Sequence, residues 1–288
     1  MNSNLKISVV TPSYNQGAFL EETLLSVKEQ GYPALEHIVI DGGSTDRSVE
    51  ILKKYSSQPG WGHLHWVSGP DGGQSDALNK GFKLATGDII GWLNSDDRYR
   101  SGCFEKIASS VAQYPEADVF YGDSTFMNEK GHVWRIRREI EFNRFILHHL
   151  YMLYILTAAT FFRRRVFQDG NWIDTKYSYA MDYEFILRLD DKGYRFRHVP
   201  ELLADFRIHP QSKSISQPKR TREEHNLIGV MYSPVLRSMR GTFSRKLVLN
   251  GLRFIARGLR YSEKLLRGYY LEQFGPPTST IIRSRGRQ

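Results

Sequence analysis

Short apolar runs alternate with segments of helical periodicity along the first hundred residues. Runs at 7–11, 37–40 and 64–68 have the residue types of strands, and a fourth run ends at about Trp92. Between them, apolar residues recur on one helical face at 20–27, around 49–52 and at 74–84. This alternation predicts an α/β fold in which βαβ units build a parallel sheet.

The predicted strands run into polar turns. Asp41 follows the second strand, Asp71 the third, and Asn94-Ser95-Asp96-Asp97 the fourth. Because the carboxyl ends of parallel strands meet at one edge of an open sheet, these side chains are expected to face one crevice. Aspartate is also an ordinary turn residue, so a solvated turn is the alternative for each of them taken alone.

Two adjacent carboxylates at the mouth of a buried strand suit a hard divalent cation such as Mg²⁺ or Mn²⁺, which in turn suits a diphosphate. The sequence has no G-x-G-x-x-G after the first strand and no G-x-x-x-x-G-K-[ST] anywhere. These absences argue against a dinucleotide-binding oxidoreductase and against a P-loop enzyme. The pattern still predicts a sheet that binds a nucleotide.

The pattern is less regular after Asp97. We expect a helix at 102–113, a strand at 119–123, and an aromatic-rich segment, 142–168, that covers the sheet as the wall of a second subsite. Residues 179–189 have apolar residues at helical spacing, with Asp182 near the positive end of the helix dipole. The segment 212–218 is predicted to be a linker.

Composition narrows the class of protein. With 40% hydrophobic residues over 288 positions the chain is predicted to be globular, and its one cysteine, Cys103, fits a reducing compartment. The first residues contain no apolar signal-peptide core, and the longest uncharged apolar run, 150–162, is too short to span a bilayer. We therefore expect a cytoplasmic protein.

The net charge of +9 comes entirely from the last quarter of the chain. Residues 216–288 contain 15 Lys and Arg against 4 Asp and Glu, and the remainder has a net charge of −2. A basic amphipathic helix over 242–272 predicts either an anionic membrane surface as partner or docking on the chain's own domain through the apolar stripe. Nucleic acid is not expected, since no recognised motif accompanies the charge. A helical wheel places Val248, Leu252, Ile255, Leu259, Leu266 and Tyr269 on one side and Lys246, Arg253, Arg257, Arg260, Lys264 and Arg267 on another.

Four signatures stand in order along the chain: Thr11-Pro12-Ser13-Tyr14-Asn15, Asp41-Gly42-Gly43-Ser44-Thr45-Asp46, Asn94-Ser95-Asp96-Asp97 and Met181-Asp182-Tyr183. Together they resemble the family 2 glycosyltransferases, inverting enzymes of the GT-A fold that use nucleotide-diphosphate sugars. The resemblance covers about 5–215 and implies a Rossmann-like mixed sheet flanked by helices. Residues 1–100 would be the nucleotide-sugar-binding half and 101–215 the acceptor-binding half, with 216–288 as a basic helical C-terminal extension.

The resemblance implies a donor side formed by Pro12, Tyr14, Asn15, Asp41, Asp71, Gln74, Ser75, Lys80 and Asp96. Tyr14 would offer its ring to the nucleobase, and Asp41 would accept from a base N–H, which favours uracil or thymine. Lys80 would face the diphosphate, and Asp96 would bind the ribose. Structural alternatives remain for these positions, since Pro12 can end a strand, Tyr14 can be a core residue and 74–76 can cap a helix.

Asn94-Ser95-Asp96-Asp97 resembles the metal-binding D-x-D element of the family, with Asn94 in place of the first acid. Asp97 would then be the direct ligand of Mn²⁺ or Mg²⁺, with help from Asp96. His209 resembles a position that in some relatives reaches the metal or the diphosphate, although a lone histidine is often structural.

Asp182 is the predicted catalytic base, and Glu184 is the fallback. Relatives commonly have Glu-Asp where this chain has Met181-Asp182, so only the second acid remains. Inversion requires a base within hydrogen-bond reach of the acceptor hydroxyl, opposite the departing diphosphate, and one carboxylate suffices. The structural alternative is an acid that stabilises the start of its helix.

The resemblance therefore implies metal-dependent transfer of a sugar, with inversion, from a UDP or dTDP type of donor to a carbohydrate. The basic tail suggests a lipid-linked acceptor at the inner face of the cell membrane, as in bacterial cell-surface polysaccharide synthesis. One alternative is a non-catalytic nucleotide-sugar-binding protein, since Asn94 and Met181 depart from acidic positions. Another is a sugar nucleotidyltransferase, although 12–17 is not the glycine- and lysine-rich loop that such an enzyme needs.

Overall fold

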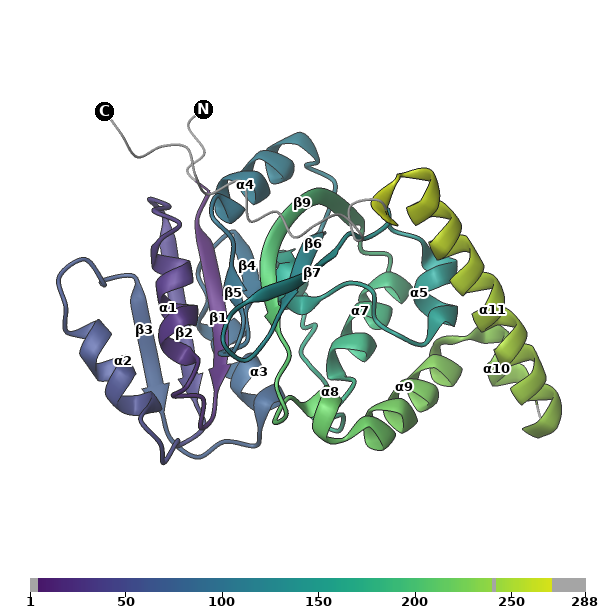
Figure 1. Cartoon of the computed structure of the whole chain (residues 1–288), viewed down its shortest axis with the longest axis horizontal. Coiled ribbons are helices and arrows are strands. Elements are labelled where there is room, and N and C mark those ends of the chain that lie inside the picture. The colour runs from purple at the N-terminus through teal and green to yellow at the C-terminus, as the bar shows by residue number, and fades with distance from the viewer. Residues whose placement is uncertain (1–4, 240–241, 271–288) are drawn as a thin grey trace.

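A computed structural model describes residues 5–239 and 242–270 of the chain (Figure 1). Its strands are β1 (Ile7–Ser13), β2 (Leu35–Asp41), β3 (Leu64–Ser68), β4 (Ile89–Trp92), β5 (Arg98–Tyr99), β6 (Val119–Met127), β7 (Val133–Arg137), β8 (Thr160–Arg163) and β9 (Phe196–Arg207). Its α-helices are α1 (Leu20–Lys28), α2 (Ser48–Ser56), α3 (Gln74–Leu84), α4 (Cys103–Gln113), α5 (Arg144–Leu150), α6 (Arg165–Gln168), α7 (Met181–Asp191), α8 (Lys213–Ser216), α9 (Pro218–Tyr232), α10 (Pro234–Ser238) and α11 (Thr242–Leu266), with a short 3-10 turn at Thr157–Ala159.

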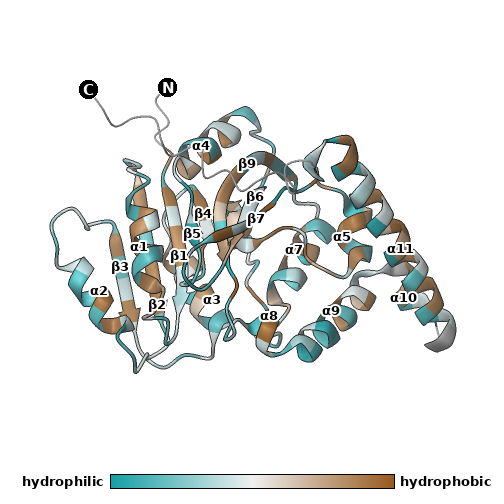
Figure 2. Ribbon diagram, in the orientation of Figure 1, coloured by the Kyte–Doolittle hydropathy of each residue, from teal (hydrophilic) through white to brown (hydrophobic). Residues whose placement is uncertain are grey.

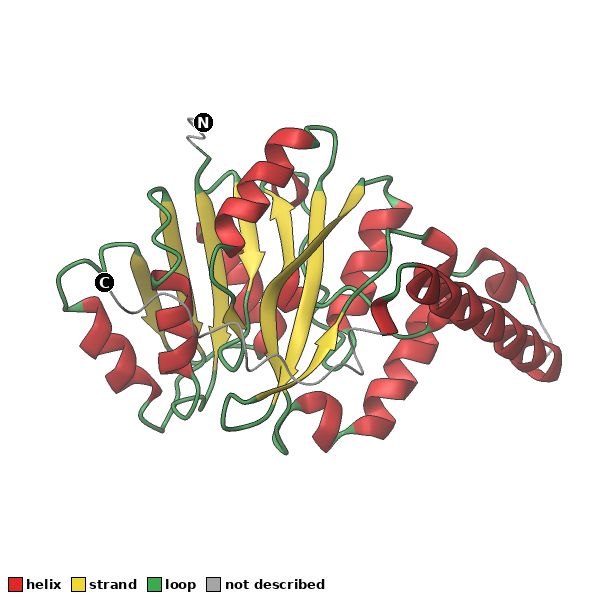
Figure 3. Cartoon of the chain, turned by 45° about the horizontal axis from the view of Figure 1, so that its top comes forward, coloured by secondary structure: helices red, strands yellow, loops and turns green. Residues whose placement is uncertain are grey.

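The strands form one mixed sheet in the order β3-β2-β1-β4-β8-β6-β9-β5, with β7 paired to β6 (Figure 3). The first four strands in this order are parallel to one another, as the alternating pattern predicts. Beyond them, β8 is antiparallel to both β4 and β6, while β6 and β9 are parallel. The predicted α/β fold with a mixed sheet and flanking helices is confirmed.

Helices cover both faces of the sheet because successive strand residues point to opposite sides. Val9 in β1 packs in the cluster that contains α4 and the start of β1, whereas Val10 packs with α3, α5 and α7. A third cluster joins α1 and α2 to β2. The hydropathy colouring shows apolar and polar residues alternating along these helices (Figure 2).

The C-terminal region differs from the predicted linker and helix. Residues 213–216 form α8, and Pro218 opens α9, where its fixed φ and missing N–H suit the first helical turn. Helix α11 lies along α5 (Figure 1). The last residues of the predicted membrane-binding segment, 271–272, and the rest of the extension to 288 lie outside the described residues.

Part of the cationic side of helix α11 contacts the body of the protein, while of the predicted apolar stripe Val248, Leu252 and Tyr269 are half-buried and Ile255 and Leu259 are exposed. Arg260 and Lys264 lie 2.7 and 3.3 Å from the buried carboxylate of Glu139, and Arg253 lies over the ring of Tyr151 at 4.3 Å. Leu266, which the wheel placed on the apolar stripe, is exposed. Arg253, Arg260 and Lys264 thus face the body of the protein, whereas Lys246 and Arg257 are exposed, and much of the apolar surface of the helix also faces solvent.

Candidate active site

The loops that follow β1 and β2 are joined to each other at the carboxyl edge of the sheet. The backbone N–H of Asn15 donates to Ser44 Oγ at 2.8 Å, and the side-chain oxygen of Asn15 accepts from the backbone N–H of Thr45 at 2.9 Å. Asn15 has a φ of 52°, a left-handed conformation that asparagine tolerates better than most residues. Asn15 therefore holds two of the predicted donor-binding loops together.

The aspartates after β2 and β3 are engaged within these loops. Asp41 is buried and accepts from the N–H and hydroxyl of Ser44 and from the hydroxyl of Ser68. Asp71 accepts from the N–H of Gly73 at 2.8 Å and lies so close to Gly42 that a Cβ there would be 2.9 Å from its carboxylate. The carboxylate of Asp41 therefore already orders its own loop, and the predicted contact with a base N–H would be an additional one.

Pro12 and Tyr14 lie in different surroundings. Pro12 is buried within β1, opposite Ile40 of β2. Tyr14 is 61% exposed, so the alternative that it is a core residue is wrong. An exposed aromatic ring at the end of a central strand is free to stack on a planar ligand.

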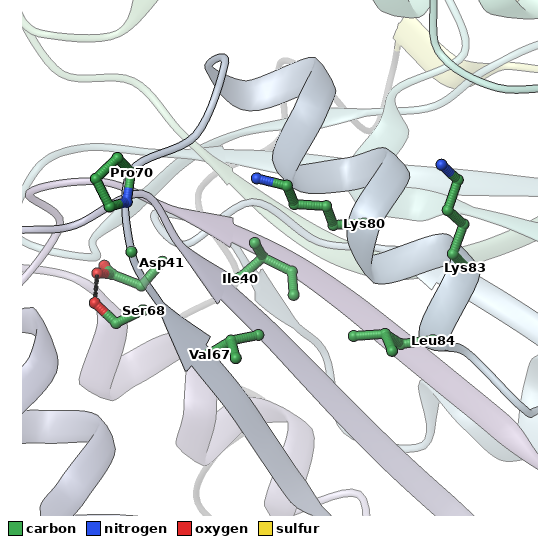
Figure 4. Close-up of a pocket in the computed structure, with 9 residues that line it drawn as sticks. Ile40, Asp41, Val67, Ser68, Pro70, Lys80, Lys83 and Leu84 are labelled. Carbon is green, nitrogen blue, oxygen red and sulfur yellow. Dashed lines mark hydrogen bonds between the residues drawn. The ribbon is translucent and has the colours of Figure 1, made fainter.

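A cavity of about 430 Å³ lies beside the ends of β2 and β3 (Figure 4). Ile40 and Val67 form part of its apolar wall, and Lys80 and Lys83 reach it from α3. The ammonium of Lys80 lies 2.8 Å from the carboxylate of Asp76, one turn earlier on the same helix. Lys80 is therefore paired, and its predicted approach to a diphosphate stays a prediction.

The turn after β4 is a network in which Asn94 is both donor and acceptor. Its carbonyl oxygen accepts from Trp92 Nε1 and from Gln74 Nε2, each at 3.0 Å, and its amide nitrogen lies 3.4 Å from Asp97 Oδ2. An aspartate in this position would present no N–H to Asp97. The amide that departs from the family pattern thus suits the turn that it occupies.

Asp97 is buried beneath this turn. Its Oδ1 accepts from the backbone N–H of Arg207 at 2.9 Å. Burial raises the pKa of Asp97 well above its usual range, and the neighbouring charge of Asp96 raises it further. Arg207 itself is buried and donates to the backbone carbonyl of Asp96 at 2.7 Å. Asp97 and Arg207 together fix the backbone that presents Asp96.

Asp96 lies beside His209. Their atoms Oδ2 and Nε2 are 3.0 Å apart, and the other ring nitrogen of His209 is 2.9 Å from Gln211 Oε1. The hydrogen bond with Asp96 raises the pKa of His209. The end of β9 thus brings His209 to the turn after β4, as the sequence predicted without fixing its role.

Asp182 occupies the first turn of α7, and its Oδ1 accepts from the backbone N–H of Tyr183 at 2.8 Å. Burial raises the pKa of Asp182, while the positive charges near it on His225 and Lys213 lower it. Met181 and Ser75 are in contact, with Ser75 Oγ 2.8 Å from the sulfur, so the start of α7 lies against the start of α3. The fallback base, Glu184, is buried and bound by Arg188 and Tyr232.

The sequence did not indicate Lys213 as a site residue, because it lies in the segment 212–218 that was predicted to be a linker. Its ammonium donates to Gln74 Oε1 at 2.9 Å and to the backbone carbonyl of Ser178 at 3.3 Å. Lys213 therefore connects the start of α3 with the loop before α7. Glu224 of α9 binds the same loop, and nothing in the periodicity of either segment indicates these contacts.

A group of three possible metal ligands lies away from this edge. Among the described residues, only His148, Asp190 and Asp191 bring three such side chains together. Arg144 forms ion pairs with both aspartates, and His148 Nε2 is 2.6 Å from Asp190. These contacts neutralise the carboxylates and join α5 to α7.

Solved structures with the same arrangement of sheet and helices define the class. The structure aligns with S. aureus TarS residues 1–349 in complex with UDP-GlcNAc at a TM-score of 0.64, with 18% identity over 86% of this chain and 71% of TarS. It aligns with the mannosyltransferase PcManGT from Pyrobaculum calidifontis in complex with GDP-Man and Mn²⁺ at a TM-score of 0.61, with 17% identity over 96% of this chain and 82% of that one. The fold is that of the GT-A glycosyltransferases.

Sequence comparison identifies the family within this class. Residues 8–175 match the family described as glycosyl transferase family 2, and the chain belongs to that family. An uncharacterized glycosyltransferase of Mycobacterium tuberculosis is 44% identical over 100 residues, which are 34% of this chain and 37% of the relative. The predicted resemblance is thereby confirmed, while the roles of the individual residues stay predictions.

Proposed function

We propose that the protein is a metal-dependent inverting glycosyltransferase. It moves a sugar from a nucleotide-diphosphate donor, of the UDP or dTDP type, to a carbohydrate acceptor in bacterial cell-surface polysaccharide synthesis. The observation on which the proposal rests is the connected edge of the sheet, where Gln74 and Lys213 join the turn of Asp96 to the loop before Asp182. A donor side and an acceptor side thus meet at one place, as transfer requires.

The metal ligands in this proposal are Asp96 and His209. Asp96 Oδ2 and His209 Nε2 lie 3.0 Å apart, close enough to bind one cation in place of their contact with each other, while Asp97 is buried and engaged with the backbone N–H of Arg207. We therefore assign Asp97, the first choice from sequence, to holding the turn. One carboxylate oxygen and one imidazole nitrogen suit Mn²⁺ better than Mg²⁺, whose protein ligands are oxygens. The cation would supply charge stabilisation for the leaving diphosphate.

Asp182 is the base that accepts the proton of the acceptor hydroxyl. Burial raises the pKa of Asp182, which suits this role because a more basic carboxylate removes a hydroxyl proton more readily. Glu184 is a poor alternative, since Arg188 and Tyr232 already bind its carboxylate.

The donor base is assigned from residues of this chain. TarS was solved with UDP-GlcNAc and PcManGT with GDP-Man, so the relatives' donors differ in their bases. Tyr14 offers an exposed ring. The hydroxyls of Ser44 and Ser68 donate to Asp41, so their oxygens remain as acceptors for a base N–H. An aromatic ring beside such acceptors fits a pyrimidine base with an N–H group, as in uracil or thymine.

The proposed location of the protein is the cytoplasm, where it binds peripherally to the inner face of the cell membrane. Among the helices that the structure describes, none is both long and apolar enough to cross a bilayer. The outward side of α11 instead presents Leu247, Phe254 and Leu265, which are 66%, 80% and 67% exposed. A helix that lies on an anionic membrane with these residues inserted would bring a lipid-linked acceptor to the site.

Turnover of a panel of nucleotide-diphosphate sugars tests the proposal. The release of nucleoside diphosphate is measured with Mn²⁺ and with a chelator, and proton NMR of the product identifies its anomeric configuration. The proposal predicts release from a uridine or thymidine donor, loss of release in the chelator, and inversion. Binding of donors without any turnover would instead support a non-catalytic nucleotide-sugar-binding protein.

A further inference from the structure

Glu224, on α9, holds the loop that leads into α7. Its Oε2 accepts from the backbone N–H groups of Tyr179 and Ala180, both at 2.8 Å, and its Oε1 accepts from the N–H of Ser178 at 3.2 Å. One carboxylate thus binds three consecutive backbone donors. Asp182 follows two residues later.

The three N–H groups that Glu224 binds lie in the loop that precedes α7. No side chain caps the start of this helix, and the preceding residue, Ala180, has no polar side chain to do so. Glu224 therefore orders the approach to the helix rather than capping the N–H groups of its first turn. Its negative charge is also favourable near the positive end of the helix dipole.

The same loop is held from two further directions. Lys213 of α8 donates to the backbone carbonyl of Ser178 at 3.3 Å, and His225, next to Glu224 on α9, stacks on the ring of Tyr183 with centroids 5.0 Å apart. The segment 213–225 thus contacts residues 178–183 through several side chains. This segment lies beyond 8–175, the part of the chain that matches the family.

The orientation of Asp182 depends on this backbone. Its carboxylate accepts from the N–H of Tyr183, within the turn whose preceding residues Glu224 binds. Loss of Glu224 would leave three N–H groups without their partner and allow the turn to reorient. A displacement of about 1 Å at a reacting group can lower a rate about 100-fold.

We propose that Glu224 is a positioning residue that sets the orientation of Asp182 for proton removal from the acceptor. It does not touch the reacting atoms and acts through the loop 178–180. This inference rests on the proposed function, in which Asp182 is the base. It also means that the active site is incomplete without α9, so that the catalytic unit extends past the predicted boundary at 215.

The test compares Glu224→Ala with Glu223→Ala in the full chain. Glu223 is the neighbouring, exposed acid of α9, so its variant makes the same change of charge and helix propensity without touching the loop. We expect Glu224→Ala to lower kcat roughly 10- to 100-fold. The donor KM and the dissociation constant of the nucleoside diphosphate should stay within about twofold of the unmodified protein, because the donor side is unchanged. Glu223→Ala should match the unmodified protein.

Normal kcat in Glu224→Ala, or a parallel loss of kcat and nucleotide affinity, would overturn the role of Glu224. If Glu224→Ala does not fold, the positioning role of Glu224 is tested with Glu224→Asp. This variant keeps the negative charge but shortens the side chain by one methylene. Lowered kcat at unchanged nucleotide affinity supports the proposal, and normal kcat overturns it. Asp182→Asn is measured in parallel. If it is inactive while the Glu224 variants are normal, only the role of Glu224 fails, whereas normal turnover in Asp182→Asn contradicts the proposed function itself.

Discussion

Asn94 shows how a single residue can depart from a family pattern for a local physical reason. The amide donates toward Asp97 and accepts from Gln74 and Trp92, a combination that a carboxylate cannot provide. Read from sequence, Asn94 looked like the loss of a charge from a metal site. In the structure it partners a buried carboxylate.

This account predicts that restoring the acid destabilises the protein. Asn94→Asp would replace a donor with a second negative oxygen beside buried Asp97 and should lower the free energy of unfolding by about 1–3 kcal/mol. Urea denaturation at neutral pH in the presence of a chelator measures the change. Asn94→Ser, which keeps a donor, serves as the control. An equal or greater stability of Asn94→Asp would contradict the account of this turn.

Tyr14 is the residue whose predicted role is easiest to isolate. Because its ring is exposed, Tyr14→Ala should leave the fold intact. The variant should weaken nucleoside diphosphate binding by about 1–3 kcal/mol, as loss of base stacking does elsewhere. Tyr14→Phe keeps the ring and should bind nearly as tightly as the unmodified protein. Calorimetry gives both dissociation constants, and an unchanged affinity in Tyr14→Ala would remove the stacking role.

For individual residues, the sequence indicated candidate site residues but not the residues that contact them. Asp41 and Asp96 were predicted to be site residues because they end strand-like runs, and Asp182 because Met181-Asp182-Tyr183 resembles a family signature. Lys213 and Glu224 were not, because each acts through a contact with a loop far along the chain, and such contacts leave no trace in local periodicity. The structure also shows a difference that the sequence does not, because Asp97 is buried and the adjacent Asp96 is not.

Among the helices, α11 is held in part by the ion pairs of Arg260 and Lys264 with one buried acid, Glu139. Burial alone would raise the pKa of Glu139, but Arg137, Arg260 and Lys264 lower it to about 2. At a pH above 4.5, the ordinary pKa of a glutamate, ionised Glu139 therefore stabilises the folded protein. This stabilisation is lost as the pH falls from about 4.5 through about 2. This contribution should appear as acid destabilisation of the contact between α11 and the body.

Glu139→Gln should be strongly destabilising for the same reason. The amide leaves the cationic side chains of Arg137, Arg260 and Lys264 buried without their counter-charge, a change that typically costs roughly 3–5 kcal/mol. Urea denaturation between pH 3 and pH 7 would show it, with a smaller loss of stability on acidification than in the unmodified protein. Stability close to that of the unmodified protein at pH 7 would show that α11 is held by other contacts.

The elements with strong local patterns were predicted well, and the short ones were not. The parallel strands β1 to β4 and helices α1, α3, α4 and α7 follow their apolar periodicity closely. Strand β5 has only two residues and exists because β9 lies beside it, so its sequence contains no independent signal. Helix α8 was not predicted because its serine residues indicated a linker, and Pro218, placed at the end of that linker, instead opens α9.

At the scale of the whole molecule, the outward side of α11 leads to a prediction about membranes. Replacing Phe254 and Leu265 together with serine should weaken binding to anionic phospholipid vesicles by about tenfold or more for each side chain, since burying such a group contributes about 1.5–3 kcal/mol. Trp134→Ser, at another exposed apolar position on β7, is the control. Vesicle sedimentation measures the binding, and undiminished binding of the double variant would contradict the proposed orientation.

The division of the chain is also a property of the whole molecule. The predicted halves, 1–100 and 101–215, contribute strands to one continuous sheet, and α9 binds the loop that precedes Asp182. The extension is thus built into the proposed acceptor side rather than attached to it. Sequence could not show this, because the contacts join segments with unrelated local patterns.

In the proposed function, Asp182 removes the acceptor proton beside a donor held at the edge of the sheet. This role can be measured as the steady-state turnover of Asp182→Asn with the preferred donor, with nucleoside diphosphate binding determined on the same sample. Asp191→Asn, at the exposed end of the same helix, is the matched control. The account predicts that Asp182→Asn loses at least about 100-fold in kcat, the lower range for a general base, while it binds the nucleotide normally. Near-normal turnover in Asp182→Asn would contradict it.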